Sequence, residues 1–188
     1  LRPLKTVGQQ DDSTGMSSYN ISPGDASVIF QGALVGSPAT GTGYVDLQTA
    51  GLVLNLGAFW GTFYNDPTTL KPTFKNYYPG SITPPNGGAI EAFVYDSPAQ
   101  MYEIQSDNAG ASAQTDIFKC ADLAGTSGST LNGVSSMELG DSTLGTTGQF
   151  KIIGVSRDPE NNDIGSANVN WRVMLNESLL GSGTAGAA

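Results

Sequence analysis

The most reactive side chain in this sequence is that of Cys120, its single cysteine. The sequence contains no histidine. A thiol becomes a good nucleophile when a neighbouring base removes its proton, and the usual base is an imidazole. Without that base, Cys120 is most simply a small buried apolar residue. A lone cysteine also excludes a disulfide within the chain, so stability must come from packing or from partners.

Carboxylates are the second candidate for chemistry, and they gather in the loop at 158–163. Asp158, Glu160, Asn162 and Asp163 carry oxygen ligands of the kind that calcium prefers. Their spacing is not that of an EF-hand, and loop carboxylates are usually solvated. We therefore expect no metal and no cofactor, while the sequence leaves a cation at residues 158–163 open.

The remaining motifs predict no catalysis. No serine lies in a GxSxG elbow, and Gly181, Gly183 and Gly186 match GxGxxG where no strand leads into a helix. A glycosidase-like pair of carboxylates would meet only in the folded chain, and no spacing recommends one. We predict that the chain has no catalytic residues and is not an enzyme.

Aromatic residues form the most distinctive cluster in the sequence. The cluster comprises Phe59, Trp60, Phe63, Tyr64, Phe74, Tyr77 and Tyr78. Tyr and Trp combine a large apolar area with a polar group, which is typical of protein interfaces. We expect Phe59 and Phe63 in the core, and we predict subunit–subunit contacts for Trp60, Tyr64, Tyr77 and Tyr78.

Short β-strands must position these residues, because 25 Gly and 10 Pro favour turns over long helices. We predict strands within residues 26–35, 89–95 and 100–105, and a buried strand pair or one bulged strand within 51–64. The two clearest strands, 149–156 and 169–176, flank a polar loop and predict a hairpin. Only residues 112–123 are expected to hold a helical turn or two. The fold class is therefore all-β, with long loops.

The 188 residues suffice for one domain. Residues 1–20 show no periodicity and are expected to form an extended N-terminal arm; residues 21–177 form the β-rich domain, and 178–188 a flexible tail. Arg2 and Lys5 make the first ten residues a basic patch, read either as a solvated tail or as a docking arm. Leu1 is not an initiator residue, which indicates processing or a trimmed sequence.

Charge and hydropathy exclude several partners. A net charge of −9 disfavours binding to nucleic acid or to anionic membranes. No apolar run approaches the length of a membrane span, and the start of the chain does not resemble a signal peptide. The excursion at 65–88 is rich in proline turns, and long loops of this kind tend to be functional or interfacial.

Several segments together, in their order and spacing, carry a family resemblance. These segments are residues 2–19, 22–35 (SPGDASVIFQGALV), 57–64, 78–80, 94–105 (VYDSPAQMYEIQ), 133–143 (GVSSMELGDST) and 152–177. The chain resembles small virion proteins of podovirus-like and marine tailed phages that act as capsid decoration, or cement, proteins. It departs from their pattern at Ala33, where an acidic residue is common, and at Ser178, where histidine is common.

The resemblance implies a compact β-barrel or a tulip- or sandwich-like domain, often trimeric, on the outside of the head. We therefore expect a decoration protein that binds the outer surface of the major capsid protein lattice and stabilises the head. The expected partners are the major capsid protein and further copies of the chain in a homotrimer, with no nucleic acid and no membrane. The location implied is the virion surface, after assembly in the bacterial cytoplasm.

The expected capsid contacts are at the N-terminus, through Leu1, Arg2, Pro3, Leu4 and Lys5. Such an arm loses entropy on docking, so its apolar residues would have to become buried on the neighbour. Two alternatives remain open: a tail, collar or fibre component, and a carbohydrate-binding module on the virion surface. A planar row of exposed Trp and Tyr would favour the second alternative.

Overall fold

The computed structural model describes residues 1–6, 15–38, 40–107 and 110–181. Over this range the chain forms antiparallel β-sheets, with helical structure limited to short 3-10 turns, so the predicted all-β class is confirmed. The 3-10 turns are η1 (Pro85–Gly87), η2 (Gln114–Asp116) and η3 (Asp141–Thr143). The turn η2 falls within the segment that the sequence marked as helical.

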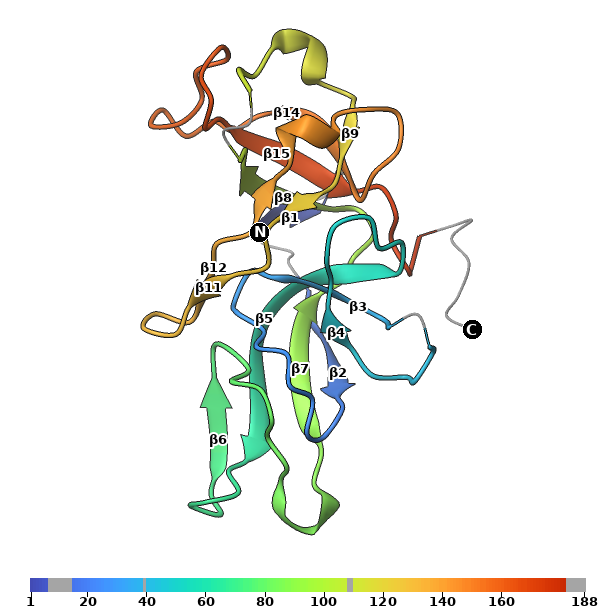
Figure 1. Cartoon of the computed structure of the whole chain (residues 1–188), viewed down its shortest axis with the longest axis vertical. Helices are drawn as coiled ribbons and strands as arrows, with labels where there is room; N and C mark the ends of the chain where they lie inside the picture. The colour runs from blue at the N-terminus through green and yellow to red at the C-terminus, as the bar shows by residue number, and fades with distance from the viewer. Residues whose placement is uncertain (7–14, 39, 108–109, 182–188) are drawn as a thin grey trace.

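Most strands of the described residues belong to two large sheets (Figure 1). The five-stranded sheet pairs β1 (Arg2–Thr6), β8 (Gln100–Gln105), β15 (Asn170–Leu175), β14 (Phe150–Val155) and β9 (Cys120–Ala121) in that order. The six-stranded sheet pairs β2 (Ser17–Ile21), β7 (Ile90–Tyr95), β5 (Asn55–Asn65), β3 (Leu34–Gly36) and β4 (Asp46–Leu47), and β6 (Pro72–Lys75) pairs with β5. Two small ribbons pair β10 (Leu123–Ala124) with β13 (Glu138–Leu139) and β11 (Gly128–Ser129) with β12 (Val134–Ser135).

Alternating side chains explain the strands that the sequence predicted. In β7, Ile90, Ala92 and Val94 are buried while the residues between them are half-exposed, as expected when successive side chains point to opposite faces. The same alternation occurs in β15, which pairs with β14 as the predicted antiparallel hairpin. The strands expected within residues 89–95 and 100–105 are β7 and β8.

The hydrophobic segment at 51–64 forms one bulged strand and not a strand pair. The pairing of β5 with β7 shifts register between Phe59 and Gly61, so Trp60 is the inserted residue of the bulge. A bulge alters which side chains face the core on either side of it. This local shift determines where the aromatic residues of β5 lie.

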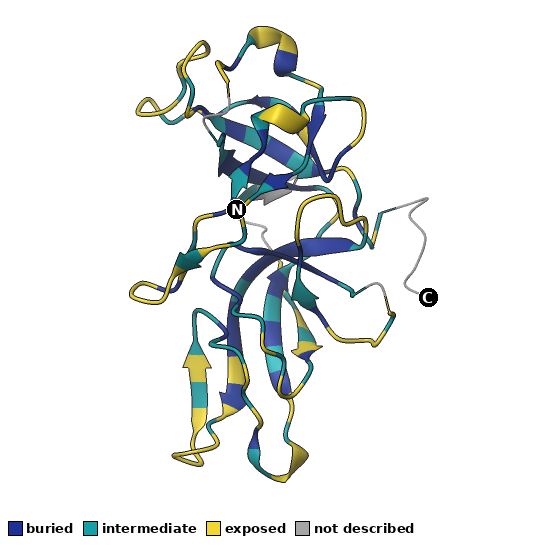
Figure 2. Cartoon of the chain, viewed as in Figure 1, coloured by how far each residue is buried: buried dark blue, intermediate teal, exposed yellow. Residues whose placement is uncertain are grey.

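The two sheets share one core. A single buried cluster contains side chains from both sheets. Tyr102, Trp171 and Val173 come from the five-stranded sheet. Leu34 and Phe59 come from the six-stranded sheet. Figure 2 shows buried positions concentrated where the sheets meet and exposed positions toward the loops at both ends. Neither large sheet closes on itself within the described residues, so neither forms a closed barrel.

Gln149 ties the two halves together with hydrogen bonds. Its buried side-chain amide donates to the Thr49 carbonyl at 2.9 Å and to Asn55 Oδ1 at 3.0 Å, and its Oε1 accepts from the Leu123 backbone N–H at 3.0 Å. A buried polar group that lost these partners would carry a large desolvation cost. The contact therefore fixes the loop before β5 against the base of β14.

The chain ends differ from the predicted arm and tail. Residues 2–6 form β1, which pairs with β8, and residues 17–21 form β2, which pairs with β7. Backbone hydrogen bonds thus hold described parts of 1–20 within the fold, because a basic, aperiodic segment can still supply an edge strand. At the other end, Ser178 is buried and the Leu179 N–H donates to the Asn55 carbonyl at 2.6 Å, whereas residues 182–188 lie outside the described range.

Candidate functional site

Aromatic side chains cover part of the outer face of β5, β6 and β7. Phe63 lies opposite Phe74 across β5 and β6, and Gly61 lies opposite Phe93 across β5 and β7. Residues directly opposed in an antiparallel pair project from the same face of the sheet. A side chain at Gly61 would meet the Phe74 ring, since an added Cβ would lie 2.7 Å from Phe74 Cζ. The missing side chain of Gly61 makes room for that ring.

Three rings on this surface, those of Trp60, Phe74 and Phe93, contact one another. The centroid of Trp60 lies 5.2 Å from that of Phe74 and 6.5 Å from that of Phe93, with interplanar angles of 42° and 80°. Phe63 and Phe74 keep 39% and 47% of their surface exposed. We term Trp60, Phe63, Phe74 and Phe93 the aromatic face. It presents connected apolar area to solvent, which is the chemistry of a binding surface.

Two of the predicted subunit contacts are wrong. Tyr64 and Tyr78 are 1% and 0% exposed, so neither side chain can reach a neighbouring subunit. Tyr64 points into the core with Thr62 because of the alternation in β5 after the bulge. Tyr78 pairs with Ile29 and donates its hydroxyl to the Asp25 carbonyl at 3.0 Å. Burial raises the pKa of Tyr78.

The other aromatic predictions divide between surface and core. Trp60 is half-buried on the aromatic face, and Tyr77 is half-buried, stacked on Phe30 at 5.9 Å with the Lys75 ammonium 5.8 Å from its ring centroid. Phe59 is a core residue as predicted. Phe63 was expected in the core and lies on the aromatic face instead, because the bulge at Trp60 turns it outward.

The predicted capsid contacts at the N-terminus are partly engaged within the chain itself. The Leu1 ammonium donates to the Gly32 carbonyl at 2.6 Å, and burial lowers the pKa of this amino group to about 6. Pro3 lies in β1 opposite Tyr102, and Leu4 is half-buried. Arg2 remains 61% exposed. The side chain of Lys5 lies outside the described residues.

A groove of about 350 Å³ connects two groups of residues that the sequence singled out separately. Leu1, Arg2 and Pro3 line it together with Trp60 and Tyr95. The predicted N-terminal contacts and one predicted subunit contact therefore adjoin in space. They meet because β1 lies at the junction of the two sheets (Figure 1).

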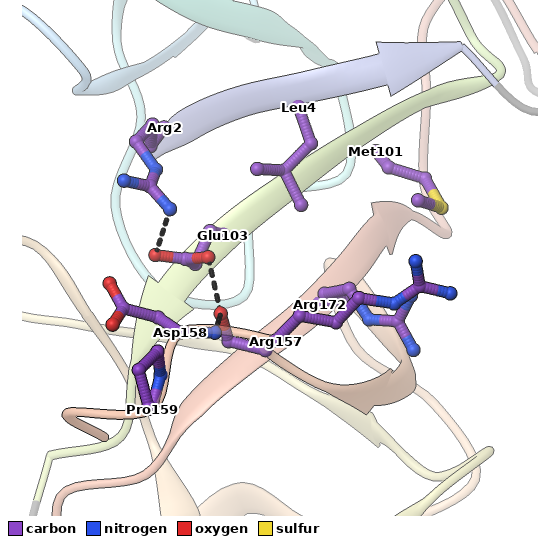
Figure 3. Close-up of a pocket in the computed structure, with 9 residues that line it drawn as sticks. Arg2, Leu4, Met101, Glu103, Arg157, Asp158, Pro159 and Arg172 are labelled. Atoms are coloured by element: carbon purple, nitrogen blue, oxygen red, sulfur yellow. Dashed lines mark hydrogen bonds and ion pairs between the residues drawn. The ribbon is translucent and has the colours of Figure 1, made fainter. Parts of the chain in front are cut away.

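A second hollow, about 470 Å³ in volume, adjoins β1 on the five-stranded sheet (Figure 3). Its polar lining consists of Arg2, Glu103, Ser156, Arg157, Asp158 and Arg172. Glu103, 9% exposed, pairs with Arg2 at 2.7 Å and accepts the Ser156 hydroxyl at 2.6 Å. We term this hollow the arginine pocket. The sequence interpretation missed Arg157 and Arg172, and the available signal was that the chain has only three arginines.

No metal centre is seen among the described residues, where no three Cys, Asp or Glu side chains converge. In the loop at 158–163, Asp158 Oδ1 accepts the Glu160 backbone N–H at 3.1 Å. Within the same range, no helix has the length and apolar character needed to cross a membrane.

Comparison with protein-family models, with curated proteins and with solved structures finds no match for this chain. The fold and its surfaces therefore define only the class: an all-β protein with an aromatic face and an arginine-lined pocket. Chemically, the aromatic face can bury apolar area against a neighbour, and the pocket can pair with an anion.

Proposed function

We propose that this chain is a non-enzymatic phage capsid decoration protein that binds the outer surface of the major capsid lattice and stabilises the head. The observation that carries the proposal is the aromatic face, because contiguous exposed apolar patches on soluble proteins often mark interaction sites. The sequence resemblance to cement proteins gives the class of partner. A cement protein requires complementary surface and no reacting group.

We assign the aromatic face to contact with the major capsid protein. Phe74 and Phe63 expose apolar rings, and Trp60 supports them from the bulge. Aromatic side chains of this kind dominate the binding energy of many protein interfaces because they bury large areas with few rotamers to fix. The acidic body, with a net charge of −9, would stay away from the packaged genome.

We further propose that the decorating unit is a homotrimer, with Tyr77 at the contacts between copies. Tyr77 is half-buried in the single chain, and its ring is held by Phe30 and Lys75. A trimer would present three weak capsid contacts at once, and effective concentration would then make detachment slow. Sedimentation equilibrium should give three times the chain mass, and Tyr77→Ser should shift it toward one.

The carbohydrate-binding alternative requires a flat aromatic platform. The rings of the aromatic face are tilted by 42° to 80° relative to the Trp60 plane, which does not match the flat face of a sugar ring. A tail or fibre component would be expected to show extended repeats or heptads, and the sequence contains neither. These features favour the decoration role.

Co-sedimentation with heads assembled without this protein tests the proposal. The variant carrying Phe63→Ser and Phe74→Ser should lose head association by at least about tenfold, since each ring contributes apolar area on the order of a kcal/mol. Phe118→Ser is the matched control, because Phe118 is 74% exposed on a different surface. Retained binding by the double variant, with an unchanged melting temperature, would remove the aromatic face from the interface. Failure of the unaltered protein to bind heads would end the decoration role.

A further inference from the structure

The three arginines of the chain converge on the arginine pocket, although they lie at positions 2, 157 and 172 of an acidic protein. Strand register explains two of them. Arg2 lies opposite Glu103 across β1 and β8, and Arg172 lies opposite the same Glu103 across β8 and β15. The result is a row in which one carboxylate separates two guanidinium groups on one face of the sheet.

Arg2 is already neutralised, whereas the other two arginines are available. Glu103 takes up Arg2 through the 2.7 Å ion pair, and its second oxygen accepts the Ser156 hydroxyl. Arg172 donates its Nε–H to the Val155 carbonyl at 2.8 Å. This hydrogen bond fixes the side chain and leaves the two terminal nitrogens to bind another group. Within the described part of the chain, neither those nitrogens nor the Arg157 guanidinium has an acidic partner.

The backbone makes space for the Arg172 guanidinium. Gly154 lies opposite Arg172 across β14 and β15, and an added Cβ at Gly154 would lie 2.8 Å from Arg172 Nη2. A larger residue would therefore displace the guanidinium. In Figure 3 the guanidinium ends of Arg157 and Arg172 point to the same side of the pocket, beside Met101.

We propose that the arginine pocket binds a carboxylate group carried next to an apolar group, with Arg157 and Arg172 as its partners. Guanidinium groups offer paired N–H donors that match the two oxygens of a carboxylate. Leu4, Met101 and Pro159 supply the apolar part of the pocket lining. The inference goes beyond the decoration role and does not depend on it.

The charge balance favours a single carboxylate over a phosphate or a polyanion. The lining carries three arginines against two carboxylates, Glu103 and Asp158, so its formal charge is +1 on a chain of −9. One negative charge is accommodated by this balance, whereas a dianion would be repelled by Asp158 and by the rest of the protein. A peptide side chain, a free carboxyl terminus or a small apolar acid would each provide the same group.

Arginine side-chain NMR tests the site directly, because three arginines give three Nε–Hε signals. The probe is N-acetyl-phenylalanine, whose carboxylate adjoins an apolar ring, titrated into the full chain at neutral pH. We expect the Arg172 and Arg157 signals to shift saturably. N-acetyl-phenylalanine amide should cause no such shift, and inorganic phosphate should bind more weakly.

Variants then distinguish a specific binding site from general charge attraction. Arg157→Gln and Gly154→Ala should each lower the affinity for the probe by about tenfold, which is the range expected for loss of a charge-assisted pair of hydrogen bonds. Arg157 is exposed, so its variant should fold normally. The matched control is Lys151→Gln, which removes the same charge from an exposed residue outside the pocket and should change affinity less than about twofold.

Four results would overturn the proposal. They are the absence of saturable shifts with the carboxylate probe, equal binding of the amide, tighter binding of phosphate, and equal losses in Arg157→Gln and Lys151→Gln. None of these depends on the heads, so failure here leaves the decoration role intact. Conversely, if the protein failed to bind heads, the proposal for the arginine pocket would still stand.

Discussion

The outer faces of the two sheets each use a strand glycine to make room for a large side chain, but one face is apolar and the other is charged. On the six-stranded sheet, Gly61 leaves space for the Phe74 ring, and the surface becomes apolar. On the five-stranded sheet, Gly154 leaves space for the Arg172 guanidinium, and the surface becomes cationic. In each case a strand glycine lets a large side chain from the neighbouring strand lie flat across it.

This comparison separates what the core must do from what each surface can do. The inner faces share one apolar cluster, so a change there affects both surfaces together. The outer faces carry different residue types on separate sheets, so a change on one should leave the other intact.

The largest effect is expected from the shared core. Gln149→Leu should lower the free energy of unfolding by about 3 kcal/mol or more, because several buried polar groups would lose their partner at about 1–3 kcal/mol each. These groups include the Leu123 N–H and the Thr49 carbonyl. Urea denaturation measures the change. Gln114→Leu, at an exposed position, is the control and should stay within about 0.5 kcal/mol. A Gln149→Leu protein of normal stability would contradict the shared core.

The two glycines should differ in their effect on stability. Gly61→Ala places a Cβ 2.7 Å from Phe74 Cζ and 2.9 Å from the Lys75 carbonyl oxygen, and a backbone atom cannot move aside easily. We expect a loss of about 1–3 kcal/mol together with reduced head binding. Gly154→Ala displaces only the end of the flexible Arg172 side chain and should cost less than about 1 kcal/mol. Thermal denaturation of both variants measures the difference, and the reverse order would contradict this geometry.

Salt should separate the two surfaces without any mutation. At about 1 M salt the screening length falls to about 3 Å, so carboxylate binding at Arg157 and Arg172 should weaken several-fold. Head association through the aromatic face should change less than about twofold, because apolar contacts are not screened. The probe titration and the co-sedimentation assay give both numbers. Equal salt sensitivity would mean that both assays report the same electrostatic contact.

The smallest effect concerns pH and lies apart from both surfaces. Burial raises the pKa of Asp141 above its ordinary 3.8, and the carboxylate accepts the Ser106 hydroxyl at 2.5 Å. The folded state then retains a proton that the unfolded state has lost, so stability falls as pH rises from about 3.8 through the raised pKa. Asp141→Asn should remove this fall.

Melting temperatures across that pH window, taken as differences from the unaltered chain, measure the Asp141 effect. Asp163→Asn, at an exposed loop position, supplies the control for a general loss of one negative charge. If the stability of Asp141→Asn falls with pH as much as that of Asp163→Asn and of the unaltered protein, Asp141 is not the source of the fall.

Local sequence patterns were sufficient to predict the class and the hairpin. The alternation in residues 149–156 and 169–176 predicts β14 and β15 because each strand buries one face. The excess of glycine and proline correctly excluded long helices. The strand β1 was missed because Arg2 and Lys5 give no apolar alternation, and its partner β8 lies about a hundred residues away along the chain.

Site residues were harder to predict because register decides them. Tyr64 and Phe63 are neighbours in sequence, and only the bulge at Trp60 determines which of them faces the core. The pairing of Arg2 and Arg172 with one Glu103 depends on the registers of three strands far apart in sequence. Composition revealed the aromatic cluster and the rarity of arginine, but neither identifies which side chains become exposed together.

Electron cryomicroscopy of heads reconstituted with the purified protein tests the central proposal most directly, because it shows which surface meets a neighbour. We expect density for a shell subunit packed against Trp60, Phe63 and Phe74. Particles in which the aromatic face is open to solvent while the protein is bound elsewhere would contradict the proposal.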